Sequence, residues 1–527
     1  MIHHLLRTGS QHLLRAWCRS GYPQVHRSLR ERVSLSSTVI PAWSIKDDSY
    51  VRLQIRWPTF EASIPACTGY TSLVTTDPRR SLPSVDAILV ALPGLPAGGR
   101  ERALATEAAR EVLAEARDGA RAGAQPSLQE LASRTRLVIE RRLAPSLVRV
   151  INASGVILQT NLGRAPLGRA ALEAIAEAAA YSNLEFDLGP GTRGSRHDHV
   201  RDMIRRATGA EDGLTVNNNA AALFMVLHVF AQGREVIVSR GQAVEIGGGF
   251  RIPDVLRQSG ARLVEVGTTN RTYASDYEAA VTPDTAAILR VHTSNFQVVG
   301  FTAEPTVDEL ASVAAQKGVL LIDDLGSGCL VETRAYGLAH EPTVQESLSA
   351  GSDLALFSGD KLLGGPQSGI IAGRSDLVAE LRRHPLARAL RLDKLTIAAL
   401  NATLMQYVLG RQDSGIPVWE MLRREPASLR RRARRWARAA GERGTIVRSR
   451  TMVGGGSLPG QGVETWCAAI THADGADGLA RHLRERYAPV IGRIEDGAVL
   501  LDPRTVDPTD DRIVEEAVTR VLSESGG

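Results

Sequence analysis

Between residues 149 and 395 the sequence alternates short apolar runs with polar or helical stretches, and this alternation is the strongest constraint on the fold. The runs are Val236–Val238, Leu263–Val266, Ala286–Val291, Val319–Ile322, Leu354–Phe357 and Ile370–Ala372. Near-continuous apolar strands separated by crossovers are typical of a mostly parallel sheet covered on both faces. Ligands of such sheets bind beyond the carboxyl ends of the strands. We therefore expect an α/β domain whose site lies where the strands end.

Polar segments follow these runs, as a site at the strand ends requires. They are Ser239–Gly241, Gly267–Asn270, His292–Asn295, Asp323–Gly328 and Ser358–Lys361. The last segment places Lys361 among glycines, in a chain with only four lysines among its 63 basic residues. Because arginine supplies positive charge elsewhere, this lysine indicates an amine that must be able to lose its proton. Schiff-base chemistry with pyridoxal phosphate is the commonest such need, and a surface lysine in an ordinary turn is the simpler alternative.

Pyridoxal phosphate also needs a carboxylate at its ring nitrogen and a site for its phosphate. Asp323 ends a predicted buried strand, and Asp324 should point to the other face because strand residues alternate. We favour Asp323 as the partner of the ring nitrogen. The alternative is that the two aspartates only cap a helix. The segment Asn217–Leu223 enters an alanine-rich helix, and a helix N-terminus binds anions. The cofactor site is therefore expected to include Asn218, Asn219, Ala220 and Ser358.

Several other classes of protein have no support in the sequence. There is no GxxxxGK[ST] motif for nucleotide phosphates, and no run of 18 apolar residues that could span a membrane. His197 and His199 are one residue apart, but no further ligands accompany them, so we expect a substrate-facing loop and no metal. The four cysteines are scattered without metal spacing, which favours a reducing compartment such as the cytoplasm.

The remaining segments differ from the central one. Residues 1–79 lack a periodic apolar face and are expected to be a disordered or mis-called N-terminal extension. Residues 80–148 predict a helical domain, with one helix over Arg100–Ala124 and a second that begins with a capping box of Ser127 and Glu130. Residues 396–527 predict a small α/β domain. They include an arginine-rich run, Arg430–Arg438, for which a solvated helix face is the simpler interpretation and nucleic-acid contact the alternative.

Long, ordered motifs resemble those of the bacterial L-seryl-tRNA(Sec) selenium transferases, the selenocysteine synthases. The segments that carry the resemblance are Asn152–Gly155, Thr160–Arg164, Ser239–Gly241, Glu245–Gly248, Phe250–Pro253, Glu265–Thr272, His292–Asn295, Asp323–Gly328, Ser358–Gly369 and Pro489–Arg493. The resemblance extends from about residue 81 to the C-terminus. It implies a fold-type-I pyridoxal phosphate-dependent transferase with a helical N-terminal tRNA-binding domain. It also implies a large homo-oligomer, typically a decamer.

The resemblance implies that seryl-tRNA(Sec) is converted to selenocysteinyl-tRNA(Sec) with selenium from selenophosphate, through a cofactor-bound dehydroalanyl intermediate. Lys361 would carry the cofactor as an imine and take the Cα proton, with Asp323 and Asp360 as further catalytic residues. Arg164 would lie near the cofactor. The selenophosphate site would consist of Arg388, Arg391, Thr268, Thr269 and Asp360.

Two alternatives remain open. One is a lyase of the same superfamily that acts on a small phosphorylated amino-sugar acid, and the other is an inactive tRNA-binding protein. The helical segment 80–148 argues against the lyase, because a small substrate needs no such domain. The presence of Lys361, Asp323 and both donor-site arginines argues against the inactive protein.

Overall fold

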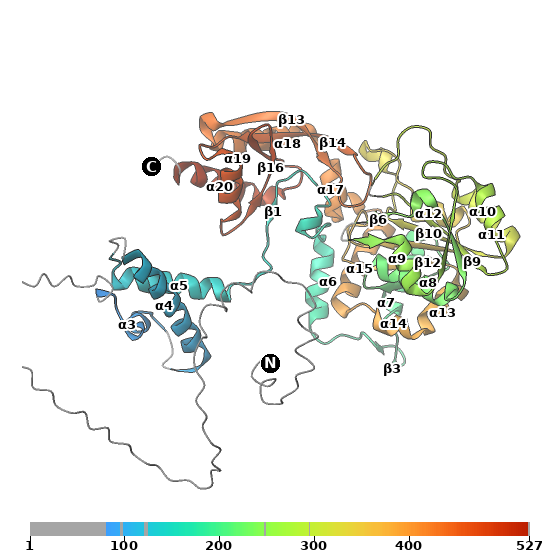
Figure 1. The fold of residues 1–527 in the computed structure, drawn as a ribbon, viewed down its shortest axis with the longest axis horizontal. Helices are drawn as coiled ribbons and strands as arrows, with labels where there is room; N and C mark the ends of the chain where they lie inside the picture. The colour runs from blue at the N-terminus through green and yellow to red at the C-terminus, as the bar shows by residue number, and fades with distance from the viewer. Residues whose placement is uncertain (1–80, 95–97, 121–124, 247–248, 295, 525–527) are drawn as a thin grey trace, which may run out of the picture. The chain divides into compact units, whose positions relative to one another are not determined.

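The structure is a computed structural model that describes residues 81–94, 98–120, 125–246, 249–294 and 296–524 (Figure 1). The chain divides into two compact units between Arg142 and Leu143. The extension predicted for residues 1–79 lies outside the described residues. None of the helices in the described part of the chain combines the length and the apolar character that a membrane crossing requires.

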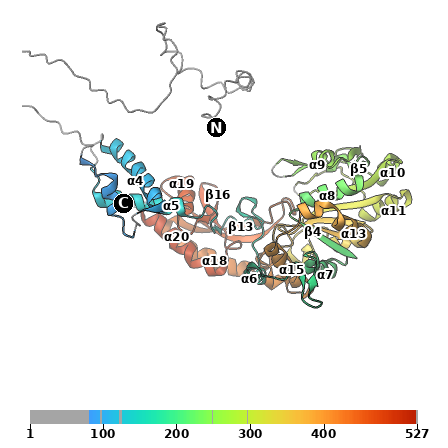
Figure 2. The ribbon, with the colours of Figure 1, turned by 90° about the horizontal axis from the view of Figure 1, so that it is seen from below.

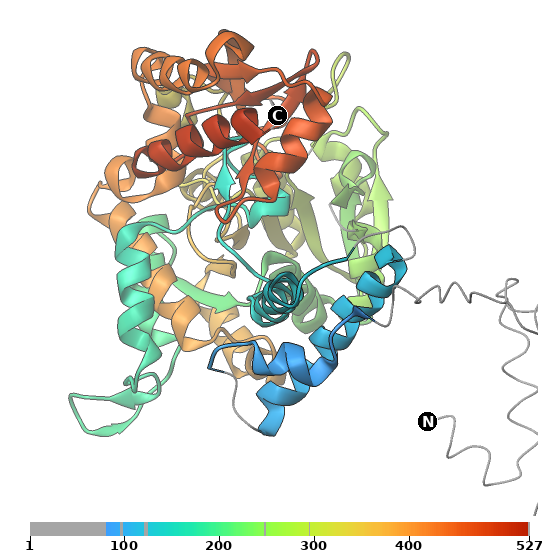
Figure 3. The ribbon, with the colours of Figure 1, turned by 90° about the vertical axis from the view of Figure 1, so that its left-hand side faces the viewer.

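The first unit contains helices α3 (Val85–Val90), α4 (Gly99–Ala120) and α5 (Leu128–Leu143), coloured blue to cyan in Figure 3. The predicted capping box at the start of α5 is confirmed. Ser127 N donates to the Glu130 carboxylate at 2.7 Å, and Glu130 N donates to Ser127 Oγ at 3.2 Å. The core of this unit includes Ile88, Leu89, Val112, Leu113 and Leu131. The three helices therefore pack around an apolar core of their own.

The second unit is built on a seven-stranded sheet. Its strands, in order across the sheet, are β4 (Asp212–Val216), β12 (Gly369–Gly373), β11 (Leu354–Ser358), β10 (Leu320–Gly326), β9 (Thr285–Val291), β5 (Glu235–Ser239) and β8 (Arg262–Val266). Only β12 runs antiparallel to its neighbours. Each of the six predicted apolar runs coincides with a strand of this sheet, apart from Val319, which lies just before β10, so the predicted mostly parallel sheet is confirmed. The edge strand β4 was not predicted.

Helices cover both faces of the large sheet. One face holds α8 (Asn219–Ala231), α9 (Ile252–Ser259) and α13 (Ser375–Arg383). The other holds α7 (Asp198–Thr208), α10 (Ala274–Ala280), α11 (Val307–Lys317), α12 (Val344–Ser349) and α15 (Lys394–Val408). Figure 2 shows α8 and α9 on one side of β4, with α7 and α15 on the other. Strand residues alternate between the faces, so Ile322 of β10 packs with α8 whereas Leu321 packs with α11.

The C-terminal part contains a four-stranded antiparallel sheet. Its strands, in order, are β13 (Gly444–Met452), β14 (Gly462–Ile470), β17 (Ala498–Leu501) and β16 (Arg493–Glu495). Helices α18 (Pro426–Ala439), α19 (Gly475–Arg484) and α20 (Asp511–Glu524) pack on it, coloured orange to red in Figure 3. The predicted division between residues 395 and 396 stays a prediction. Helix α15 runs across that position and packs against α7 and α6 (Arg169–Ala179).

Candidate active site

A pocket of about 270 Å³ lies where the strands of the large sheet end, at the edge predicted to hold a site. Strands β9, β10 and β11 contribute residues at or just after their carboxyl ends, and α8 contributes its N-terminus. The lining residues are Arg164, Asn218, Asn219, Ala220, Val291, His292, Ser294, Asp324, Gly326, Ser358, Asp360, Lys361 and Gln367. Lys361 and six other predicted catalytic or cofactor-binding residues thus line one pocket. Asp323 is the member of the predicted set that does not line it.

Lys361 lies in the glycine-rich loop that follows β11, with only 6% of its surface exposed. Burial lowers the pKa of its amine, and the nearby charge of Asp324 opposes that shift. Glycine leaves room for the amine, because a Cβ added at Gly456 would lie 3.2 Å from Lys361 Nζ. The structure therefore surrounds this lysine closely and favours the neutral amine that Schiff-base chemistry requires.

The sequence favoured Asp323 as the ring-nitrogen partner, but the structure places Asp324 in the pocket in its place. Asp323 shares a face of β10 with Leu321, so it points toward α11 and α12. There it pairs with Arg290 at 2.8 Å and accepts a hydrogen bond from Ser347 Oγ at 2.6 Å. The alternation of the two aspartates was predicted correctly, but the sequence did not show which face carries the pocket.

Asp324 lies on the face covered by α8, where Asn219 Nδ2 donates to its Oδ1 at 2.8 Å. It is only 5% exposed, and burial raises the pKa of its carboxyl to about 6. The charged form of Asp324 therefore lacks a full set of partners in the described residues. A cation placed beside it in the pocket would stabilise that charge.

The N-terminus of α8 faces the same pocket. Asn218 caps the helix by accepting a hydrogen bond from Ala221 N at 2.9 Å. The first N–H groups of a helix have no partner within it, and the helix dipole favours an anion there. Gly369 of β12 packs so closely that an added Cβ would lie 2.1 Å from Asn218 O. The sheet thus fixes the turn that begins α8.

Arg164 and Asp360 form an ion pair at the rim of the pocket. Arg164 Nη1 donates to Asp360 Oδ2 at 2.8 Å, and Ala165 N donates to Asp360 O at 3.2 Å. Arg164 has a φ of 63°, a left-handed conformation that is uncommon for a residue with a side chain. These contacts connect the loop around Arg164 directly to the loop that carries Lys361.

The predicted donor-binding residues do not meet within one chain. Arg388, in α14 (Pro385–Ala389), and Arg391 line a hollow of about 400 Å³ that also contains Arg193, Arg196 and Arg382. Thr268 and Thr269 follow β8 and line a separate hollow of about 320 Å³. Of the predicted donor set, only Asp360 lines the Lys361 pocket. A shared donor site for all five residues stays a prediction.

Sequence reasoning did not single out His292 or its partner Glu341. His292 lines the pocket, and its Nε2 lies 3.3 Å from a carboxylate oxygen of Glu341, which is 2% exposed. The polar segment after β9 was the available signal for His292. Glu341 follows no strand, so nothing in the local pattern pointed to it.

The pocket residues match the chemical requirements of pyridoxal phosphate. A buried lysine and a buried carboxylate flank a helix N-terminus that is open to an anion. The side-chain oxygen of Asn219 is buried without a hydrogen-bond partner among the described residues, which leaves an acceptor for a donor from a bound molecule. The residues that would hold the cofactor are Lys361, Asp324, Asn218, Asn219, Ala220 and Ser358.

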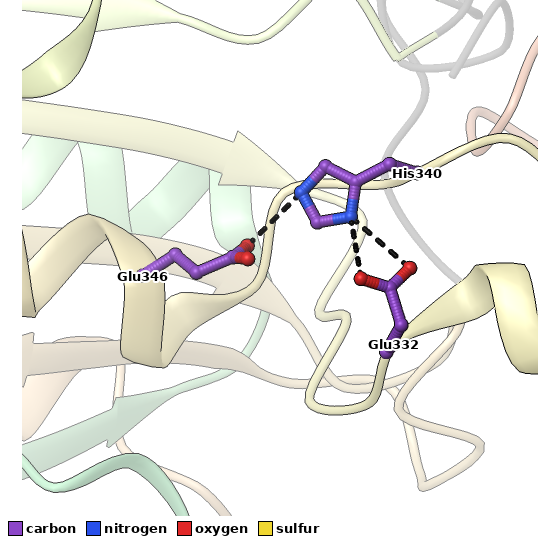
Figure 4. Close-up of side chains that lie close together, drawn as sticks. All are labelled: Glu332, His340 and Glu346. Atoms are coloured by element: carbon purple, nitrogen blue, oxygen red, sulfur yellow. Dashed lines mark hydrogen bonds and ion pairs between the residues drawn. The ribbon is translucent and has the colours of Figure 1, made fainter.

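Glu332, His340 and Glu346 form a separate cluster outside the pocket (Figure 4). His340 Nδ1 lies 3.2 Å from the Glu332 carboxylate, and Nε2 lies 3.2 Å from the Glu346 carboxylate. The two ring nitrogens thus face different carboxylates, and a single ion cannot be bound by both nitrogens of one imidazole. This arrangement favours an ion-paired cluster that braces the loop before α12 over a metal centre.

Comparisons with known proteins identify relatives over most of the chain. Residues 150–507 match the family model described as SelA, L-seryl-tRNA selenium transferase. The L-seryl-tRNA(Sec) selenium transferase of Carboxydothermus hydrogenoformans is 46% identical over 440 residues, covering 81% of this chain and 94% of the relative. That of Hyphomonas neptunium is 47% identical over 443 residues, covering 81% and 95%.

Among solved structures, a D-glucosaminate-6-phosphate ammonia-lyase aligns with a TM-score of 0.53 at 22% identity. The alignment covers 74% of this chain and 99% of that one. Identity at this level shows a shared fold alone. The fold is that of the fold-type-I pyridoxal phosphate-dependent enzymes, as the sequence predicted.

Proposed function

The chain belongs to the L-seryl-tRNA selenium transferase family, and from this premise we propose that it converts L-seryl-tRNA(Sec) to L-selenocysteinyl-tRNA(Sec) in the cytoplasm. Pyridoxal phosphate is the cofactor and selenophosphate is the selenium donor. The observation that carries the proposal is the buried Lys361, which shares a pocket with Asp324 and the α8 N-terminus. The family model matches residues 150–507, which include this pocket.

When bound, pyridoxal phosphate accepts electrons from the α-carbon of an attached amino acid, which labilises the Cα proton and a leaving group at Cβ. Lys361 Nζ would hold the cofactor and would then be available to accept the Cα proton, because burial lowers its pKa and so favours the neutral amine. The charge of Asp324 would hold the proton on the ring nitrogen, and Asn219 fixes the orientation of the Asp324 carboxylate. The N–H groups at the start of α8 bind the cofactor phosphate.

Selenophosphate binding is proposed for the arginine-rich hollow of Arg388 and Arg391 together with Thr268 and Thr269. Guanidinium groups bind phosphate oxygens with two parallel hydrogen bonds. The two sets of residues line separate hollows of one chain, and a site that uses both would form where two subunits meet. This supports the proposal of a homo-oligomer, for which we take a decamer as the expected state.

The helical unit at residues 81–142 is proposed to bind tRNA. Its arginines are partly committed to internal ion pairs, since Arg134 contacts Glu115 and Arg142 contacts Glu111. Arg110, Arg117 and Arg141 have no ion pair among the described residues. Recognition by this unit therefore depends on shape as well as charge.

Removal of residues 81–142 tests the proposal, because this unit has its own core. The intact protein should convert seryl-tRNA(Sec) to selenocysteinyl-tRNA(Sec) when supplied with selenophosphate. The shortened protein should bind pyridoxal phosphate normally but lose affinity for the tRNA. An intact protein that leaves seryl-tRNA(Sec) unchanged, yet releases ammonia from D-glucosaminate 6-phosphate, would establish the lyase alternative instead.

A further inference from the structure

Helix α18 contains six arginines and no acidic residue. Two of the six point toward α20: Arg432 pairs with Asp511 at 2.7 Å, and Arg435 pairs with Asp511 and Glu515. The other four, Arg430, Arg431, Arg434 and Arg438, are exposed and have no ion pair among the described residues. The helix therefore has one neutralised flank and one flank with uncompensated positive charge.

The edge strand β13 extends this charged flank. Arg448 and Arg450 are two residues apart in the strand, so they lie on the same face, and both are exposed. In the register of β13 with β14, Arg448 lies opposite Trp466. Two guanidinium groups contact the Trp466 ring, with distances to the ring centroid of 4.7 Å for Arg430 and 5.2 Å for Arg448. Trp466 thus joins the helix and the strand into one surface, because cation–π contacts hold both arginines against it.

We refer to this surface as the basic ribbon, made of Arg430, Arg431, Arg434, Arg438, Arg448 and Arg450. Arg430, Arg434 and Arg438 are spaced four residues apart, so they form a line of about 12 Å along the helix. Glu425, Glu442 and Glu464 are nearby acidic residues, and none of them forms an ion pair with the ribbon among the described residues. Some exposed arginines on other helices do have partners at helical spacing, as in the pairs Arg169–Glu173 and Arg512–Glu516.

We propose that the basic ribbon binds the phosphate backbone of tRNA, as a second contact surface beyond the N-terminal helical unit. The inference rests on the proposed function, since it concerns how that substrate is held. A ribbon built only of arginine suits phosphate, because each guanidinium fork matches a pair of phosphate oxygens. Such contacts position an RNA without reading its sequence.

The surface does not match a protein partner equally well. Protein interfaces bury an apolar core in which aromatic and aliphatic residues are enriched. None of the large hydrophobic side chains found exposed on the described chain lies in α18 or β13. Trp466 is half-buried beneath its two arginines rather than presented to a partner. A hydrated polyanion is therefore the better occupant.

The test uses the full-length protein with R434E and R438E together, which leaves the Trp466 contacts intact. The matched control is R512E with R520E, which makes the same change in charge on α20 of the same domain. The probe is uncharged tRNA(Sec), titrated at several salt concentrations. The ribbon variant should bind the tRNA at least tenfold more weakly, and the slope of log affinity against log salt should fall by about two, since each phosphate contact contributes about one. The control should change both quantities much less.

Equal tRNA affinity and salt slope in the ribbon variant and the control would overturn the inference. So would a ribbon variant that keeps wild-type tRNA affinity but sediments as a smaller assembly, because the surface would then join subunits. Cofactor loading, measured by visible absorbance, shows that each variant is folded. If the wild-type protein binds tRNA through the ribbon but does not form selenocysteinyl-tRNA, the proposed function fails while this inference stands.

Discussion

Asp323 and Asp324 are adjacent in the sequence, yet the sheet gives their carboxylates unrelated surroundings. Asp323 is fully buried against Arg290 and Ser347, whereas Asp324 contacts Asn219 in the pocket. The sequence predicted that the two would alternate, because alternation follows from strand geometry. It could not predict which face holds the pocket, because that depends on where α8 packs.

Substitution of each aspartate by asparagine should separate their roles. D324N removes the charge beside the cofactor ring, so pyridoxal phosphate affinity should fall about 10- to 150-fold, as expected for loss of a charge-assisted contact of about 1.5–3 kcal/mol. D323N leaves Arg290 buried without its partner, so the free energy of unfolding should fall by roughly 3 kcal/mol. Cofactor titration and chemical denaturation measure the two effects.

The pH dependence of cofactor binding gives the same prediction a second readout. Burial raises the pKa of Asp324 to about 6 in the cofactor-free protein. Below that pH the carboxyl is neutral and cannot stabilise a cationic ring, so the stabilisation of the protein by the cofactor should increase as pH rises through this range. D324N should abolish the increase and D323N should preserve it. A normal cofactor affinity and pH profile in D324N would show that Asp324 is not the partner of the ring nitrogen.

Arg388 and Arg391 offer a second prediction at this scale. If they hold the donor's phosphate, R388A and R391A should each raise the selenophosphate concentration needed for half-maximal rate about 10- to 150-fold, from the loss of about 1.5–3 kcal/mol. Cofactor absorbance should not change, since neither residue lines the Lys361 pocket. R383A is a useful control, because Arg383 lines the same hollow and is not one of the predicted donor residues. If R388A and R391A both reach half-maximal rate at the wild-type selenophosphate concentration, this hollow does not bind the donor.

At the scale of elements, the strands of the large sheet were predictable because buried parallel strands are continuous apolar runs. β4 and β13 were not predicted, for different physical reasons. β4 (Asp212–Val216) carries a buried aspartate that pairs with Arg201 and Arg382, which interrupts its apolar pattern. β13 is an edge strand with exposed arginines, so it lacks a continuous buried face.

The contact between β12 and the start of α8 is a prediction at this scale. G369A would place a Cβ 2.1 Å from Asn218 O and 2.8 Å from Asn219 N. The first turn of α8 must then move, so cofactor affinity should fall by at least tenfold, because the helix N-terminus no longer aligns with the phosphate. G373A is the matched control at the other end of the same strand, where an added Cβ would meet Asp353 O at 2.1 Å. G373A should lower the unfolding free energy without this selective loss of cofactor binding. Equal losses of cofactor affinity in the two variants would contradict the assignment of the α8 N-terminus as the phosphate site.

At the scale of the whole chain, we propose that the two units divide the work that the family's reaction requires. The helical unit at 81–142 and the sheet-based unit have separate cores, so we expect that loss of the helical unit removes tRNA capture and leaves cofactor binding. Most of the motifs that carry the family resemblance follow strands of the large sheet, and this is why the fold and the Lys361 pocket were predictable. The separation of the Arg388 and Thr268 hollows was not, because sequence motifs do not show which residues meet within one subunit.

Borohydride reduction in the presence and absence of substrate tests the central claim most directly. Reduction of the protein with pyridoxal phosphate alone should attach the cofactor to Lys361, identified by peptide mass. Saturating seryl-tRNA(Sec) should protect Lys361, because the seryl amine takes over the link to the cofactor, whereas D-glucosaminate 6-phosphate should give no protection. Labelling of Lys317 or Lys394 in place of Lys361, or protection by D-glucosaminate 6-phosphate and not by seryl-tRNA(Sec), would contradict the account.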